Sequence, residues 1–219
     1  MEEDLASIAV EHASKLGADY VDARLEDHYN ELIMVANGGI QRGVINRKCG
    51  IGIRALVNGA WGFQSTTDLT KKGVMETAKI AFKVAKASSR YVSTPVRLAP
   101  TKAYKTSYKS KVKADLEDVA FEDKLEQMKT WEKRLHTSKK IVRGLADYTG
   151  IKINKIFVNS EGADIRFSNS IAWVSLKADS KKGNVTQFYE TTVGHSGGYE
   201  IFQKIDIEKI ASKIGRKAE

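Results

Sequence analysis

The residues best suited to chemistry lie near the carboxyl end of the chain, in the segment Gly194-His195-Ser196-Gly197-Gly198-Tyr199. A histidine beside a serine suggests a hydrolase site, because an imidazole can take the proton of a serine hydroxyl. The base must lie within hydrogen-bond reach of the nucleophile, however, and the side chains of adjacent residues seldom point at each other. The sequence therefore argues against serine-type catalysis. Two interpretations stay open: a glycine loop whose backbone amides position a ligand, and a plain connector.

Metal binding is a second chemistry to consider, because histidine and cysteine are the usual ligands of zinc. The candidates are four histidines and the single cysteine: His12, His28, His136, His195 and Cys49. They lack the paired spacing of a structural zinc site, so we expect this chain to bind no metal ion. One cysteine also excludes an internal disulfide framework.

Basic residues dominate the charge of the chain. The sequence has 36 Lys and Arg against 27 Asp and Glu, a formal net charge of +9 that permits attraction to nucleic acid. The densest run is TKAYKTSYKSKVK from Thr101 to Lys113, in which lysines alternate with Tyr104 and Tyr108. Single-stranded bases can stack on such aromatic rings while lysines neutralise phosphates. Because no compact nucleic-acid motif encloses the run, we favour a solvated connector.

The stretch from Gly50 to Asp68 organises the amino-terminal half. Alternating apolar residues flank Asn58-Gly59, a pair that predicts a type I′ turn because both positions need a positive φ. The result is a hairpin that leads into a helix capped by Asp68. Three glycines fall inside the expected strands: Gly50, Gly52 and Gly62. A glycine within a strand marks a bulge or a close backbone approach, and we favour crowded packing over contact with a ligand.

Arginines also fall in expected strands: Arg24, Arg42, Arg47 and Arg54. They could form a face that binds carboxylates or phosphates, because the guanidinium group contacts both in bidentate geometry. The alternative is that they occupy the solvent-exposed face of a half-buried sheet.

Hydrophobic periodicity predicts an α+β fold, with antiparallel sheets built from meanders and hairpins and flanked by amphipathic helices. Helices are expected over residues 3–16, 68–88, 118–137 and 206–218. Strands are expected on both sides of the Asn58-Gly59 turn and over residues 20–26, 32–36, 40–47, 141–149, 151–158, 163–167, 171–179 and 185–193. A loop is expected around residues 27–30, where polar residues follow one another.

The stretch GIGIRALVNGAWGFQSTTDLT, from Gly50 to Thr70, resembles the amino-terminal half of the TldD/PmbA family. Further matching features are Gly17-Ala18-Asp19-Tyr20, Val21-Asp22-Ala23-Arg24, the Asn37-Gly38 turn and GHSGGYEIF at 194–202. Their order agrees from about Leu5 to Phe202, nearly the whole chain. Members of this family are candidate metalloproteases that were once named modulators of DNA gyrase.

The resemblance implies a protein about twice this length, whose zinc motif, His-Glu-x-x-x-His, lies in the second half. No such motif occurs in these 219 residues. We therefore expect no catalytic or metal-binding residue in this chain, zinc in the full-length protein, and no activity of this portion alone. The expected domains are an N-terminal domain over 1–202, with sub-parts 1–92, 93–117 and 118–202, and at 203–219 the start of a helix leading to an absent C-terminal metallopeptidase domain.

The resemblance also implies a cytoplasmic homo- or heterodimer with a family paralogue, which cleaves small or unfolded peptides and has no membrane segment. An extended peptide could add to a sheet edge. The candidate substrate-binding residues are Arg54, Trp61, Gly194, His195, Gly197, Gly198 and Tyr199. The alternative function is a basic module that binds nucleic acid or a topoisomerase-related partner.

Overall fold

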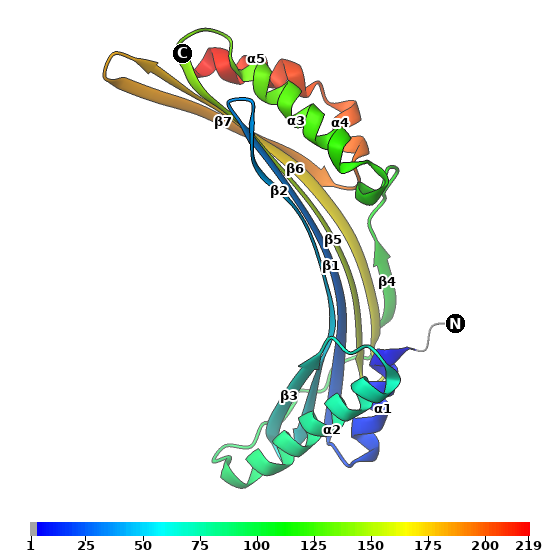
Figure 1. Cartoon of the computed structure of the whole chain (residues 1–219). Coiled ribbons are helices and arrows are strands. Elements are labelled where there is room, and N and C mark those ends of the chain that lie inside the picture. Colours follow the sequence, from blue (N-terminus) through cyan, green and yellow to red (C-terminus); the bar gives the residue numbers. More distant parts are fainter. Residues whose placement is uncertain (1–3) are drawn as a thin grey trace. The chain divides into compact units, whose positions relative to one another are not determined.

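The computed structural model describes residues 4–219 and confirms the α+β fold (Figure 1). The described helices are α1 (Leu5–Lys15), α2 (Lys71–Ser88), α3 (Phe121–Leu135), α4 (Glu200–Lys204) and α5 (Ile207–Ala218). The strands are β1 (Tyr20–Ala36), β2 (Gly39–Val57), β3 (Ala60–Thr66), β4 (Lys105–Lys109), β5 (Ile141–Asn159), β6 (Asp164–Lys182) and β7 (Val185–Ser196). They form one sheet in the order β3-β2-β1-β5-β6-β4, and β7 also pairs with β6.

The sheet is antiparallel, except where the short strand β4 pairs with β6 in parallel. Strand β4 lies within the segment 93–117, for which the sequence predicts a connector. Its register places Tyr108 opposite Phe167 and Lys109 opposite Ser168. Backbone pairing at the sheet edge therefore orders part of this basic run, although all five residues of β4 keep exposed side chains.

The chain divides into two compact units that interleave along the sequence. Unit 1 combines residues up to 28 with 48–109 and 153–168, and unit 2 combines 29–47, 110–152 and 169–219. Each of the strands β1, β2, β5 and β6 contributes residues to both units. The sub-parts expected from the sequence are contiguous, and their boundaries stay a prediction.

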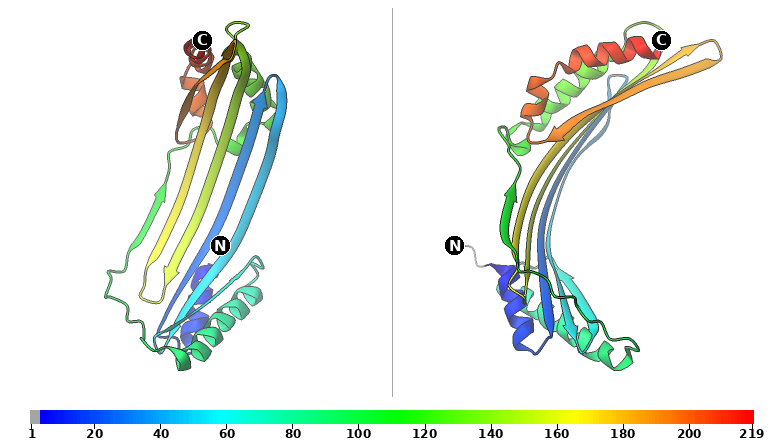
Figure 2. Two further views of the ribbon diagram at one scale, coloured as in Figure 1. Left: turned by 90° about the vertical axis from the view of Figure 1, so that its left-hand side faces the viewer. Right: turned by 180° about the vertical axis from the view of Figure 1, so that it is seen from behind.

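The core of unit 1 lies where α1 and α2 pack on β1, β2 and β3. Small residues dominate it, among them Ala9, Ala13, Ala23, Ala55, Ala78, Ala81 and Ala85. They allow the helices to approach the sheet closely, and α2 runs alongside β3 (Figure 2). A Cβ atom at Gly62 would clash with the backbone of Ala81 and Ala85 in α2. Close packing therefore explains this glycine, as the sequence suggests.

The core of unit 2 is built by α3, α4 and α5 against the other parts of the long strands. It contains Met128, Trp131 and Leu135 of α3 together with further aromatic rings. Within this core Lys124 donates to Glu31 at 2.5 Å, and both side chains are 1% exposed. Lys124 also donates to the Leu116 carbonyl, so its ammonium group is well paired. Burial of an ion pair stabilises a fold only if such bonds replace water.

Local turn and capping signals are confirmed in part. Asn58 and Gly59 have φ values of 49° and 77°, and Val57 pairs with Ala60, which confirms the type I′ turn. The predicted helix cap at Asp68 is wrong by two residues, because the Thr70 side chain accepts the bond from Gly73 N and caps α2. Asp68 instead accepts a bond from Thr70 N.

The strands are longer than predicted. The prediction of a loop around residues 27–30 is wrong, because β1, a strand of 17 residues, runs through these positions without interruption. Two predicted strands merge in each of β2, β5 and β6, which have 19 residues each. Backbone pairing with neighbouring strands overrides the polar composition that is typical of loops. Within residues 4–219, no helix is long and apolar enough to cross a membrane.

Candidate functional site

An open groove of about 780 Å³ lies in unit 1, over β1, β2 and β3. Strand alternation builds it, because Val21 and Ala23 are buried under the helices while Asp22 and Arg24 point to the other face of the sheet. The groove is lined by Asp22, Arg24, Glu26, His28, Lys48, Cys49, Gly50, Ile51, Gly52, Arg54, Phe63, Ser65, Thr66 and Thr67. The groove therefore brings charged side chains of β1 together with the exposed Phe63 ring and the hydroxyl groups of β3.

Two glycines of β2 leave room between these walls. A Cβ atom at Gly52 would lie 3.2 Å from the Phe63 ring, and one at Gly50 would lie 3.1 Å from the Thr66 carbonyl. Because neither glycine carries a side chain, the middle strand presents bare backbone to the groove. Phe63 itself is 58% exposed. The floor is therefore suited to contact with an apolar group.

Arg54 and Trp61, both predicted as site residues, are brought together at one end of this region. Asp22, 1% exposed, accepts three bonds from Arg54: from Nε to Oδ1 at 3.1 Å and to Oδ2 at 3.0 Å, and from Nη2 to Oδ2 at 2.6 Å. This pairing raises the pKa of Arg54. The guanidinium carbon lies 4.9 Å from the centre of the Trp61 ring, which Tyr20 meets edge-on. The arginine is thus held in one orientation from two sides.

The other carboxylate of the groove is also neutralised. Glu26 accepts a bond from Lys155 Nζ at 2.7 Å and contacts His28 Nε2 at 2.8 Å. The bond from Lys155, opposed by burial and helped by His28, lowers the pKa of Glu26. Arg24 behaves differently, because its guanidinium lies 5.3 Å from the centre of the Phe157 ring and has no ion pair among residues 4–219.

The predicted glycine loop lies in unit 2 and is partly a strand. Gly194 and His195 belong to β7, where they pair with Trp173 and Ala172 of β6. The His195 ring contacts the backbone carbonyl of Ser196, whereas the Ser196 hydroxyl donates to Asn169 at 3.0 Å. The two side chains therefore have separate partners.

The second half of that segment is anchored within unit 2. Gly197 N donates to the Ser170 carbonyl and Tyr199 N to the Ala114 carbonyl, each at 2.8 Å. The Tyr199 ring is 1% exposed, packs on Phe202, and burial raises the pKa of its hydroxyl. Its side chain belongs to the core, which a sequence pattern of glycines around one tyrosine does not reveal.

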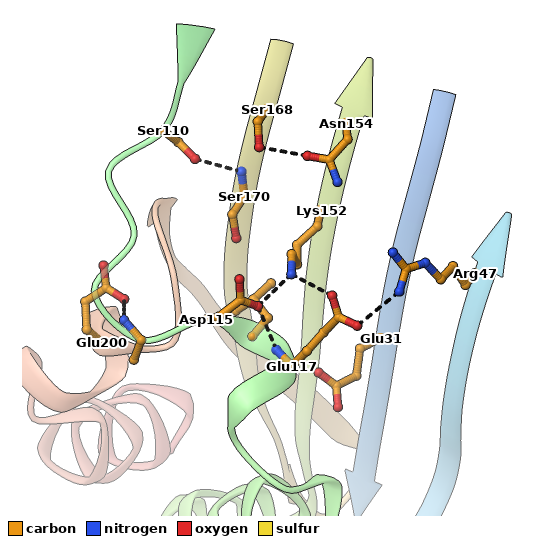
Figure 3. A network of polar contacts seen from close by, with 12 residues as sticks. Glu31, Arg47, Ser110, Asp115, Glu117, Lys152, Asn154, Ser168, Ser170 and Glu200 are labelled. Atoms are coloured by element: carbon orange, nitrogen blue, oxygen red, sulfur yellow. Dashed lines mark hydrogen bonds and ion pairs between the residues drawn. The ribbon is translucent and has the colours of Figure 1, made fainter. Parts of the chain in front are cut away.

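A polar network holds the segment that leads into α3 (Figure 3). Lys152 Nζ donates to Asp115 Oδ1 at 2.7 Å and to Glu117 Oε1 at 2.6 Å, and Arg47 lies 3.5 Å from Glu117. Burial opposes the charge of Asp115, but the bonds from Lys152 and the backbone outweigh it and lower the pKa of that carboxyl. Sequence reasoning missed this network, since the bonds from Lys152 and Arg47 to Glu117 join residues 35 and 70 positions apart.

The histidines, cysteine and carboxylates do not fit a metal site. Within residues 4–219 no group of three or more of these side chains is arranged to hold an ion.

Two models of one family match most of the chain. The PmbA/TldA metallopeptidase domain 1 matches residues 21–85, and the PmbA/TldA metallopeptidase central domain matches residues 114–219. The chain belongs to the TldD/PmbA family. Arg54 and Trp61 fall within domain 1, and the glycine segment falls within the central domain.

Individual TldD/PmbA relatives agree with this assignment. A protein of Methanothermobacter thermautotrophicus named metalloprotease is 25% identical over 209 residues, which cover 91% of this chain and 42% of the relative. A candidate modulator of a DNA gyrase from Thermotoga maritima superposes with a TM-score of 0.77 at 16% identity, over 100% of this chain and 48% of that structure. TldE from Thermococcus kodakarensis superposes with a TM-score of 0.75 at 16% identity, over 98% of this chain and 47% of that structure.

These structures show that the fold is shared. The chain spans less than half the length of the relatives it matches.

Proposed function

We propose that this chain is the N-terminal, non-catalytic half of a TldD/PmbA-type zinc metallopeptidase, which acts in the cytoplasm on small or unfolded peptides. One observation carries the proposal. The chain matches domain 1 and the central domain of a metallopeptidase family, yet residues 4–219 hold no group of side chains suited to a metal. The role of this half is therefore to bind and guide the peptide, while the metal is held by other residues.

The groove of unit 1 supports this role. A peptide in extended conformation needs a long, open surface with backbone groups and a few fixed polar side chains. The groove offers a floor without side chains at Gly50 and Gly52, the oriented Arg54 and the exposed Phe63. Strand β3 is also the last strand on its side of the sheet, so its outer edge can pair with a peptide backbone.

The glycine segment contributes less to this proposal. Only Gly194 and His195 of the predicted residues in this segment are exposed. Gly197 and Gly198 are buried, and a Cβ atom at Gly198 would clash with the Ala114 carbonyl. We expect these two glycines to act through packing, and Gly194 and His195 to contact a peptide.

A Trp61→Ala variant tests the peptide-binding role. The Trp61 ring holds Arg54, a groove-lining residue, at 4.9 Å from the ring centre. An aromatic residue that is important for binding often contributes about 2 kcal/mol or more, so we expect about thirtyfold weaker binding of a fluorescent unfolded peptide. Tyr91→Ala is the control, since Tyr91 is 86% exposed and does not line the groove. Melting temperatures of both variants show whether the fold is kept. Equal peptide affinity of Trp61→Ala and the unmodified chain would contradict the proposed surface.

We further propose that the subunit pairs with a second copy or with a family paralogue, a possibility supported by the likeness to TldE. The nucleic-acid alternative is supported by Tyr108, which stacks on Phe167 with ring centres 5.3 Å apart. Strand alternation, however, places Lys105 and Lys109 on the face opposite Tyr108. Stacked bases and neutralised phosphates would then lie on different faces, so we favour the peptide. Binding of a single-stranded oligonucleotide that weakens steeply with salt would favour the alternative.

A further inference from the structure

We propose that the groove of unit 1 selects peptides that carry an acidic side chain close to an apolar one, an inference that rests on the proposed peptide-binding function. The selection follows from how the charges of the groove are paired and from what its floor exposes. Each part is carried by a different set of contacts.

The carboxylates of the groove are already occupied. Asp22 is bound to Arg54 through three bonds, and Glu26 is bound to Lys155 and His28. A basic side chain of a peptide would therefore have to displace an existing partner. Charge that is already neutralised in this way offers little attraction to a second cation.

The cations of the groove are not all occupied. Arg24 and Lys48 line it, both side chains are exposed, and neither has an ion pair among residues 4–219. Arg24 is also oriented by the Phe157 ring, at 5.3 Å from its centre. A guanidinium group fixed on one face by an aromatic ring keeps its edge free for a bidentate contact with a carboxylate.

The apolar part of the preference comes from β2 and β3. Gly50 and Gly52 leave the floor without side chains, and Phe63 stands 58% exposed beside Gly52. An apolar side chain of the peptide placed there removes apolar surface of both partners from water. Arg24 and Phe63 line the same groove from β1 and β3, the two strands that flank β2. An acidic residue near an apolar residue therefore fits both contacts at once.

Two peptides with blocked termini, identical except for Glu or Gln beside a Phe, test the inference by fluorescence anisotropy with the chain. We expect the Glu peptide to bind about tenfold tighter, as one charge-assisted hydrogen bond predicts. Arg24→Gln should remove the difference between the peptides. Arg97→Gln, which changes an exposed arginine outside the groove lining, should keep it.

The position of the bound peptide can be read from the substitution Ser65→Cys, because Ser65 is exposed, lines the groove and pairs with Gly52. In a chain that also carries Cys49→Ala, which removes the only natural cysteine, the Glu peptide should slow alkylation of the introduced thiol by iodoacetamide, with or without Arg97→Gln. A third peptide, with Gln in place of Glu and a free C-terminal carboxylate, separates the two sources of negative charge.

The outcomes distinguish the inference from the function on which it rests. Equal affinity for the Glu and Gln peptides, with the Ser65→Cys thiol protected by both, would overturn the acidic preference and leave the peptide-binding function standing. Binding that follows only the C-terminal carboxylate would overturn it as well. Absence of binding by all three peptides would contradict the proposed function itself.

Discussion

At the scale of single residues, the most consequential pair is Lys124 with Glu31, which lies in the core of unit 2. The two residues are 93 positions apart, and the ammonium group also lies within 6 Å of the ring centres of Tyr148 and Tyr199. One Glu31 oxygen, Oε1, has no hydrogen-bond partner within residues 4–219. Removal of either side chain would therefore leave the charge of the other one buried in the core.

A Lys124→Ala variant should lose about 3–5 kcal/mol of unfolding free energy, because the Glu31 carboxylate would remain buried without its cation. Lys129→Ala on the same helix is the matched control, since Lys129 pairs with the exposed Glu126. That change should cost less than about 1 kcal/mol. Urea unfolding followed by circular dichroism measures both. Similar losses of unfolding free energy for the two variants would show that the buried pair contributes no more than the exposed pair.

Glu26 gives a residue-scale prediction for pH. Its bond to Lys155 lowers its pKa in the folded state, so the carboxylate form stabilises the fold. That contribution is complete above the usual glutamate pKa of about 4.3 and disappears as the pH falls through the lower folded-state value. Glu26→Gln should therefore flatten the fall of melting temperature below pH 5 and leave its slope near pH 7 unchanged. An unchanged acid slope would contradict the ion pair.

At the scale of elements, turns and faces are predictable from the sequence, while strand pairing is not. Asn58-Gly59 specifies its turn locally, because only its own φ values matter. The continuity of β1 through residues 27–30 depends on neighbouring strands, and the pairing of β4 with β6 joins segments about sixty residues apart. For the site, alternation predicts that Arg54 lies on the same face of the sheet as Gly50 and Gly52. The partner Asp22 and the burial of Tyr199 depend on packing between distant segments.

The two type I′ turns of the sheet provide a prediction at this scale. Gly59 and Gly38 have φ values of 77° and 72°, so alanine should cost roughly 1–2 kcal/mol at either position. A Cβ atom at Gly59 would also clash with Pro95, whereas one at Gly38 meets nothing within 4 Å. Gly59→Ala should therefore lose a further 1–3 kcal/mol or so, as in an overpacked site. Equal unfolding free energies for the two variants would contradict the contact with Pro95.

At the scale of the whole molecule, membership of the TldD/PmbA family and the side chains of the described residues together support the proposed role. Residues 4–219 offer an open groove and a sheet edge in unit 1, and no group of side chains suited to a metal. The proposed peptide-guiding role relies on the groove and on this sheet edge. Binding and metal-dependent hydrolysis are then separable properties, and a measurement on this chain can separate them.

The most direct test is equilibrium binding of an unfolded fluorescent peptide to the chain, with EDTA or with zinc in the buffer, followed by mass spectrometry of the recovered peptide. We predict saturable binding with the same Kd in both buffers and intact peptide afterwards. Peptide that is cleaved only when zinc is present would contradict the account, because the chain would then hold its own metal centre. Absence of binding in both buffers would contradict the guiding role.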